Sequence, residues 1–157
     1  LILQGCNNGG DYMDSSNVEK IRDEADLVFL EYSNIVKNNR ENLIKICDWL
    51  NSKDGEFYMY VLNGKIDYID TNKGEHYKTH ENIELLLDVL IRNNFSGISQ
   101  GSEENSEIIF FRNIIKKDKQ EKIYIFHRLI YDKSEEKAYH RYRRIDENFY
   151  YLYAVGE

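Results

Sequence analysis

FYMYVLNGKIDYID, residues 57–70, is typical of two β-strands joined by a tight turn. Asn63 and Gly64 lie between the two runs, and both tolerate the positive φ that a type I′ turn requires. The sequence therefore predicts a hairpin that pairs Phe57–Leu62 with Lys65–Asp70. Such a hairpin favours an antiparallel sheet.

The residues that follow extend this sheet. A polar, glycine-bearing segment at Ser96–Ser106 is expected to be a mobile loop. Beyond it, apolar residues recur with a period of two, and short polar connections favour an antiparallel meander of four strands. The predicted strands are Glu107–Ile115, Lys122–Tyr131, Lys137–Ile145 and Phe149–Val155.

Helices are predicted before and after the hairpin in the sequence. An apolar stripe with helical spacing predicts a long amphipathic helix at residues 17–37, and Asn38-Asn39 separates it from a second helix that ends at Ser52. A polar loop at Thr71–Lys78 leads to a third helix, with Thr79 as its N-cap and its end at Asn93-Asn94.

The expected fold is therefore α+β, in the order helix, helix, hairpin, helix and four strands. Over residues 17–155 this order resembles the nuclear transport factor 2-like superfamily, whose N-terminal helices lie in the concavity of a curved antiparallel sheet. A PAS-like fold is the alternative, although it does not readily use the fourth strand of the meander.

Length and charge limit the function. A chain of 157 residues suits one domain with its own core. With 21 Lys+Arg against 28 Asp+Glu, the net charge of −7 argues against a nucleic-acid partner, which needs a basic surface. The 13 tyrosines accompany a general richness in Lys, Asn, Ile and Glu, so their number alone does not indicate a binding surface.

The first residues suggest where the protein is located. Leu3-Gln4-Gly5-Cys6, followed by the polar run Asn7–Asp11, resembles the lipobox of bacterial lipoproteins. The resemblance implies that Cys6 is acylated (diacylglycerol, with palmitate-type chains) after an export signal is cleaved. Two or more acyl chains give stable membrane anchoring. The alternative is that Leu1–Leu3 end an ordinary helix or strand and that Cys6 is an ordinary thiol.

This interpretation divides the chain into three parts. Residues 1–5 are the remnant of an export signal, residues 6–15 are the lipidated cysteine and a flexible tether, and residues 16–157 form one α+β domain. The expected location is the extracytoplasmic side of a bacterial membrane. Cys47 lies on the apolar face of the second helix, where a lone cysteine normally serves packing.

His127 is the first candidate binding residue. In the strand Lys122–Tyr131 it shares a face with Ile123, Ile125 and Leu129, which is the more apolar face. A histidine there is either an acid or base in a pocket or, as we favour, a core residue whose nitrogens are satisfied.

A second candidate is the basic, aromatic segment Tyr139–Arg144, in which His140, Tyr142 and Arg144 share one strand face. Arginine and tyrosine side chains of this kind bind carboxylate or phosphate. We favour the alternative, a solvated strand whose arginines pair with carboxylates and stack on aromatic rings.

No sequence pattern indicates a reaction or a cofactor. His76 and His80 are four residues apart, but Thr79 as a helix cap would leave His76 outside the helix, so no metal site is expected. Three functions are considered. We favour a non-catalytic domain that binds a small molecule or protein. The others are a cone-fold enzyme using a histidine with a carboxylate, and an immunity-type protein that binds through the exposed face of helix 17–37.

Overall fold

The computed structural model describes residues 15–102, 107–118, 121–133 and 142–156. Within these residues, three helices and seven strands follow one another. They are α1 (Ser15–Asn51), β1 (Phe57–Leu62), β2 (Lys65–Thr71), α2 (Glu75–Lys78), α3 (Asn82–Arg92), β3 (Gly97–Gln100), β4 (Ile108–Asp118), β5 (Glu121–Tyr131), β6 (Arg143–Arg144) and β7 (Phe149–Gly156).

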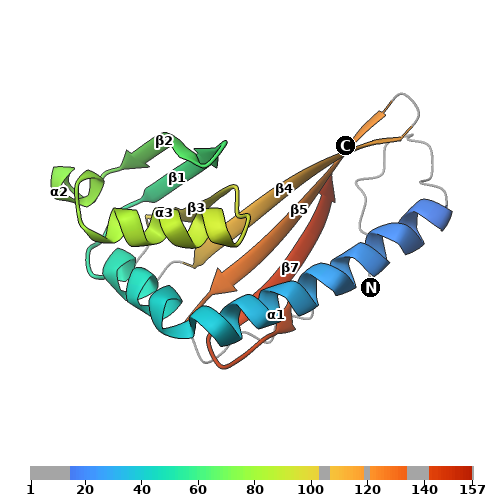
Figure 1. Cartoon of the computed structure of the whole chain (residues 1–157), viewed down its shortest axis with the longest axis horizontal. Coiled ribbons are helices and arrows are strands. Elements are labelled where there is room, and N and C mark those ends of the chain that lie inside the picture. The colour runs from blue at the N-terminus through green and yellow to red at the C-terminus, as the bar shows by residue number, and fades with distance from the viewer. Residues whose placement is uncertain (1–14, 103–106, 119–120, 134–141, 157) are drawn as a thin grey trace.

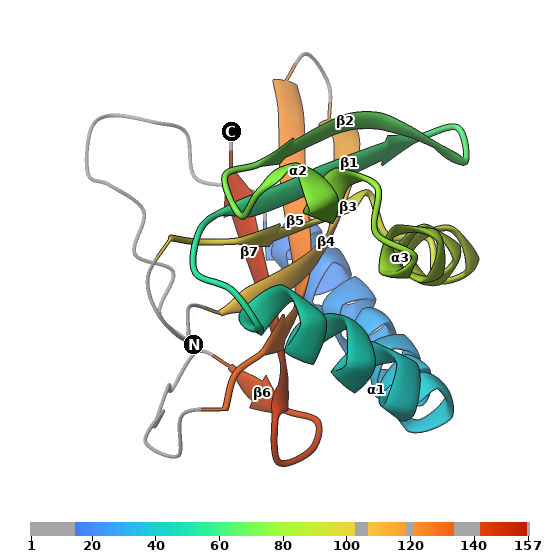
Figure 2. The same cartoon turned by 90° about the vertical axis from the view of Figure 1, so that its left-hand side faces the viewer.

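The strands form one sheet in the order β2-β1-β3-β4-β5-β7-β6, and every neighbouring pair is antiparallel. The long helix α1 runs beneath β4, β5 and β7, and α3 lies near β1 and β3 (Figure 1). Both helices lie on the same side of the twisted sheet (Figure 2). The expected α+β class with an antiparallel sheet is confirmed.

The core lies between the helices and this side of the sheet. α1 contributes a buried stripe at helical spacing, and each strand contributes alternate residues, as the pleat requires. The largest fully buried side chains are Tyr32, Tyr77, Tyr131, Tyr151, Phe57, Phe110, Phe149, Leu43, Ile46, Leu50, Met59 and Leu86. Cys47 is a buried free thiol within this core, as predicted from its helix face.

The predicted hairpin is confirmed. Asn63 and Gly64 have φ of 52° and 72°, the left-handed conformation of a type I′ turn. Tyr60 pairs with Tyr68 while Val61 pairs with Ile66, so a bulge lies between them. Bulges increase the local twist of an edge strand such as β2.

The two predicted N-terminal helices are present as two helical segments of α1 that meet at a kink. Asn39 has non-helical angles (φ −125°, ψ 15°), and its side chain donates a hydrogen bond of 3.0 Å to the Ile35 carbonyl. The asparagine pair therefore interrupts the helical backbone as predicted, and the side-chain amide of Asn39 replaces part of the lost backbone bonding.

The expected loop Ser96–Ser106 is wrong for its first part, because Gly97–Gln100 forms β3 between β1 and β4. Ile98 is fully buried, and Gln100, also buried, donates a side-chain hydrogen bond of 2.6 Å to Asn51. A strand with few apolar residues is stable here because both of its edges are paired and its polar side chain has a partner. Residues 103–106 lie outside the described residues.

The predicted strand order is also wrong. β7 pairs with β5, whereas the strand expected at Lys137–Ile145 is represented by Arg143–Arg144 at the edge beyond β7. The physical reason is packing: β7 brings the buried rings of Phe149 and Tyr151 to the helix-covered side, and β6 carries two exposed arginines. Residues 137–141 lie outside the described residues.

The predicted loop Thr71–Lys78 contains α2, so Thr79 follows α2 and is not the N-cap of α3. The cause is Tyr77, whose buried ring stacks on Trp49 at 5.0 Å and whose hydroxyl donates to the Trp49 carbonyl at 2.9 Å. At the start of α3, His80 Nδ1 accepts the Asn82 backbone N–H at 3.1 Å.

Candidate functional site

The side of the sheet that faces away from the helices carries a group of exposed aromatic residues. β1 alternates between the two sides, so Phe57, Met59 and Val61 are buried while Tyr58, Tyr60 and Leu62 point outward. Tyr68 on β2 pairs with Tyr60. Gly97 on β3 pairs with both Tyr60 and Phe111, so Phe111 on β4 lies on the same side of the sheet as Tyr60. We call Tyr58, Tyr60, Leu62, Tyr68 and Phe111 the aromatic face.

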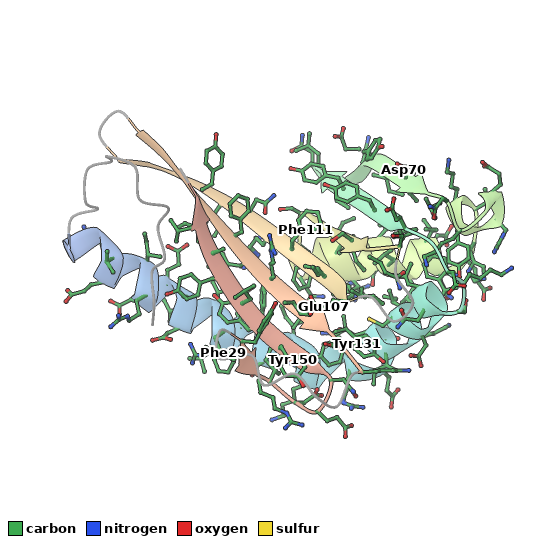
Figure 3. The ribbon with its side chains drawn as sticks, turned by 180° about the vertical axis from the view of Figure 1, so that it is seen from behind. Phe29, Asp70, Glu107, Phe111, Tyr131 and Tyr150 are labelled. Atoms are coloured by element: carbon green, nitrogen blue, oxygen red, sulfur yellow. The ribbon has the colours of Figure 1, made fainter. Side chains whose placement is uncertain are left out.

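The rings of the aromatic face contact one another across three strands. Phe111 stacks on Tyr58 (centroids 5.8 Å apart, planes 24° apart) and on Tyr60 (6.4 Å, 21°), and Tyr58 contacts Tyr68 at 5.9 Å. Figure 3 views β4, β5 and β7 from the side opposite α1, with Phe111 between β4 and the β1–β2 hairpin. The result is a continuous row of rings.

Much of this row is open to solvent. Tyr58 is 38% exposed, Leu62 50% and Tyr68 53%. The charge of the Asp70 carboxylate raises the pKa of Tyr68, and burial adds a smaller effect. Asp70 therefore places a negative charge beside the Tyr68 ring.

Gly97 allows the rings to pack this closely. A Cβ atom at residue 97 would lie 2.6 Å from Cζ of Phe111 and 2.3 Å from the Met59 carbonyl oxygen. Only a residue without a side chain fits under the Phe111 ring.

His127, the first sequence-based candidate, is fully buried beneath α1. Its Nδ1 is 2.9 Å from the Tyr151 hydroxyl, and its Nε2 is 3.9 Å from Oε1 of Glu24 on α1. Its expected position on the apolar side of its strand, with Ile125 and Leu129, is confirmed. A buried histidine with these neighbours links α1 to the sheet, and it is not accessible to a substrate.

A second polar cluster lies close by. Arg112 on β4 donates two hydrogen bonds to the Glu31 carboxylate (2.9 and 2.8 Å) and one each to the carbonyls of Asn93 and Asn94 (2.7 and 2.9 Å). Its guanidinium also lies 5.4 Å from the Tyr32 ring centre. These carbonyls end α3, where a cation is favoured by the helix dipole. Arg112 therefore joins α1, α3 and the sheet.

The structure does not bring the remaining candidates together around His127. Arg144 is exposed and donates to the Asp146 carbonyl at 2.9 Å, while Tyr142 is half-buried. Their neighbour Arg143 pairs with Asp26, and its guanidinium lies 3.7 Å from the Phe29 ring centre. Cys6 and His140 lie outside the described residues, so their roles stay predictions.

Neither histidine of the His76/His80 pair belongs to a metal cluster. His80 stacks on Trp49 at 5.1 Å, and His76 contacts the Tyr77 ring at 4.8 Å. Among the residues that the structure describes, no group of three or more His, Cys, Asp or Glu side chains is placed to hold a metal ion.

Sequence reasoning missed the aromatic face, although a signal was present. Tyr58, Tyr60 and Tyr68 all lie in the predicted hairpin, and alternation would have placed Tyr58 and Tyr60 on the side opposite Met59. Because the chain contains 13 tyrosines, those in the hairpin did not by themselves indicate a binding surface. The contribution of Phe111 depends on β3, which was not predicted.

Within the described ranges, no helix has both the length and the apolar character needed to cross a membrane. Comparison with known proteins gives no matching family model, no matching curated protein and no matching solved structure.

Proposed function

We propose that this chain is a non-catalytic binding domain that uses the aromatic face to hold a protein partner. The observation that carries the proposal is the row of contacting rings, with Tyr58 and Tyr68 exposed, on the side of the sheet away from the helices. Tyrosine combines a large apolar area with a hydroxyl and few rotatable bonds, and it is enriched at interfaces for that reason. Scattered exposed apolar residues are ordinary, whereas a contiguous group indicates a contact surface.

In-cell photo-crosslinking tests this proposal. A benzophenone amino acid placed at Tyr68 is expected to give a discrete protein adduct after irradiation. The same group placed at Leu30, on the exposed side of α1, serves as the matched control and is expected to give none. No adduct from residue 68 would contradict the proposal, and an adduct from residue 30 alone would transfer the binding surface to α1.

That second location is favoured by one observation. Leu27 and Leu30 are 68% and 59% exposed on neighbouring turns of α1. They lie on the helix face through which an immunity-type partner protein would bind. A third function, a cone-fold enzyme, gains less support, because a substrate would have to displace α1 to reach His127.

We propose further that Leu3-Gln4-Gly5-Cys6 is a lipobox and that Cys6 anchors the domain to the extracytoplasmic side of a bacterial membrane. Support comes from the motif itself and from the polar run that follows it. In the native host, with the export signal present, Cys6→Ser is expected to move most of the protein from the membrane to the soluble fraction, because the acyl chains are lost. Cys47→Ser is the matched control and should leave fractionation unchanged. Membrane association that survives Cys6→Ser would contradict the anchor.

Within the α+β class, we propose the nuclear transport factor 2-like cone over the PAS-like alternative. The support is the long N-terminal helix lying across one side of a twisted antiparallel sheet. In this arrangement the helices fill the inner side of the sheet, which leaves the opposite side for binding.

A further inference from the structure

The charged residues beside Tyr58 and Tyr68 are acidic. Asp70 is exposed on the same side of β2 as Tyr68, and the exposed Glu56 precedes β1 on the side of Tyr58, whereas Lys65 and Asp67 alternate with Tyr68 along β2. On the neighbouring strands, Arg128 lies opposite Phe111 in the β4–β5 register. The chain as a whole carries a net charge of −7. A second copy of the chain would bring two surfaces of the same sign together, which opposes association.

At two places within the protein, an aromatic ring and a neighbouring carboxylate together hold an arginine side chain. The guanidinium of Arg143 lies over the Phe29 ring and pairs with Asp26, and that of Arg112 lies near the Tyr32 ring and pairs with Glu31. In both places a ring and an acidic side chain from α1 hold one arginine. Cations are attracted both to the face of an aromatic ring and to a carboxylate.

The aromatic face presents the same pair of groups to solvent. Tyr68 is more than half exposed, and the exposed Asp70 lies two residues further along β2, on the same side of that strand, where it pairs with Tyr58 of β1. Tyr58 adds a second exposed ring next to Tyr68. Resting on the proposed function, we propose that the partner of the aromatic face is a cationic protein segment, with arginine or lysine side chains placed against Tyr58 and Tyr68 and paired with Asp70.

The probe for this proposal is a synthetic peptide of alternating arginine and serine, about ten residues long. A peptide with glutamate in place of arginine is its counterpart. Isothermal titration calorimetry at low salt is expected to detect binding of the arginine peptide and none of the glutamate peptide, with affinity falling as salt is added.

Substitution separates the aromatic face from general charge attraction. Tyr58→Ser/Tyr68→Ser leaves the net charge unchanged and is expected to weaken binding of the arginine peptide by about tenfold or more, because the rings are lost. Tyr58→Phe/Tyr68→Phe keeps the rings and should retain most of the affinity. Leu27→Ser/Leu30→Ser on α1 is the matched control and should bind normally. All of these side chains are substantially exposed, and urea unfolding verifies that each variant is folded.

Arginine-peptide binding that is unchanged in Tyr58→Ser/Tyr68→Ser would overturn the cationic partner, since attraction to an acidic chain would then explain it. Equal binding of the glutamate peptide would overturn it as well. So would a self-dimer in analytical ultracentrifugation that dissociates in this variant. A crosslinked partner at Tyr68 that lacks a basic segment would overturn this inference and leave the proposed function standing, whereas no crosslink at Tyr68 contradicts the proposed function itself.

Discussion

Arg112→Met is expected to lower the free energy of unfolding by about 3 kcal/mol, the low end of the cost of breaking a buried ion pair. Arg112 is 8% exposed, and its loss removes the hydrogen bonds to Glu31 and to the two carbonyls that end α3. The two carbonyls at the end of α3 lose their side-chain donor, which adds to the cost of losing the ion pair. Urea unfolding followed through Trp49, the only tryptophan in the chain, measures the change.

Glu31→Gln is the matched control for this prediction. The Glu31 side chain is 47% exposed and can be solvated when its charge is removed, so a loss of about 1 kcal/mol is expected. Equal losses in Arg112→Met and Glu31→Gln would show that the bonds to the carbonyls of Asn93 and Asn94 contribute nothing.

The pH dependence of stability gives an independent check on the same pair. The hydrogen bond from Arg112 holds the pKa of Glu31 below its ordinary value of 4.5, and burial opposes this shift. Because the folded pKa is the lower one, ionised Glu31 stabilises the fold fully above pH 4.5, and this contribution is lost as the pH falls through the folded pKa. The stability difference between the native chain and Arg112→Met should therefore narrow in acid.

Gly97→Ala is expected to cost about 2 to 3 kcal/mol, the upper part of the range for overpacking. The new Cβ would lie 2.3 Å from the Met59 carbonyl oxygen, which is backbone of the adjacent strand and cannot rotate away. Relief requires β3 to move from β1 or Phe111 to leave its place. Urea unfolding measures the loss of stability. Displacement of the Phe111 ring should also weaken binding of the arginine peptide.

Ser99→Ala provides the comparison on the same strand. Ser99 pairs with Tyr58 and Ile109 and lies on the same side of the sheet as Gly97. Ser99 already has a Cβ, so Ser99→Ala should change stability by no more than about 0.5 kcal/mol. Unfolding midpoints of Gly97→Ala and Ser99→Ala that coincide would show that the close approach at Gly97 is relieved without cost.

Local signals predicted the parts of the fold that depend on nearby residues. The turn at Asn63-Gly64 and the break near Asn39 follow from the backbone preferences of those residues, and both are present. β3 could not be predicted in this way, because Gly97–Gln100 is a strand only by virtue of its two neighbours. Strand order failed for a similar reason, since the place of β7 beside β5 is decided by the contact of Tyr151 with α1.

For the candidate site, too, local patterns were predictable from the sequence and contacts between distant elements were not. Strand alternation placed His127 on the buried side, but its partners come from distant elements, Glu24 on α1 and Tyr151 on β7. Alternation alone would also have grouped Tyr58 with Tyr60, whereas the contact of Phe111 with both of their rings depends on the pairing of β3 with β4. The residue pattern of a strand therefore predicts which side of the sheet each side chain occupies. Which other side chains lie next to it depends on how the strands pair.

The contacts of Tyr151 also set the order in which the protein can fold. Phe29 and Tyr32 in the first half of α1 pack against Tyr151 in β7, so the first described helix completes its packing only against the last described strand. Bringing such distant segments together costs loop-closure entropy before any contact repays it. While the chain is being synthesised, the hairpin can form early, but the apolar stripe of Val28, Tyr32 and Ile35 is not fully covered until β7 emerges and pairs with β5. The nascent chain is therefore most exposed to aggregation in the interval before β7 has been synthesised.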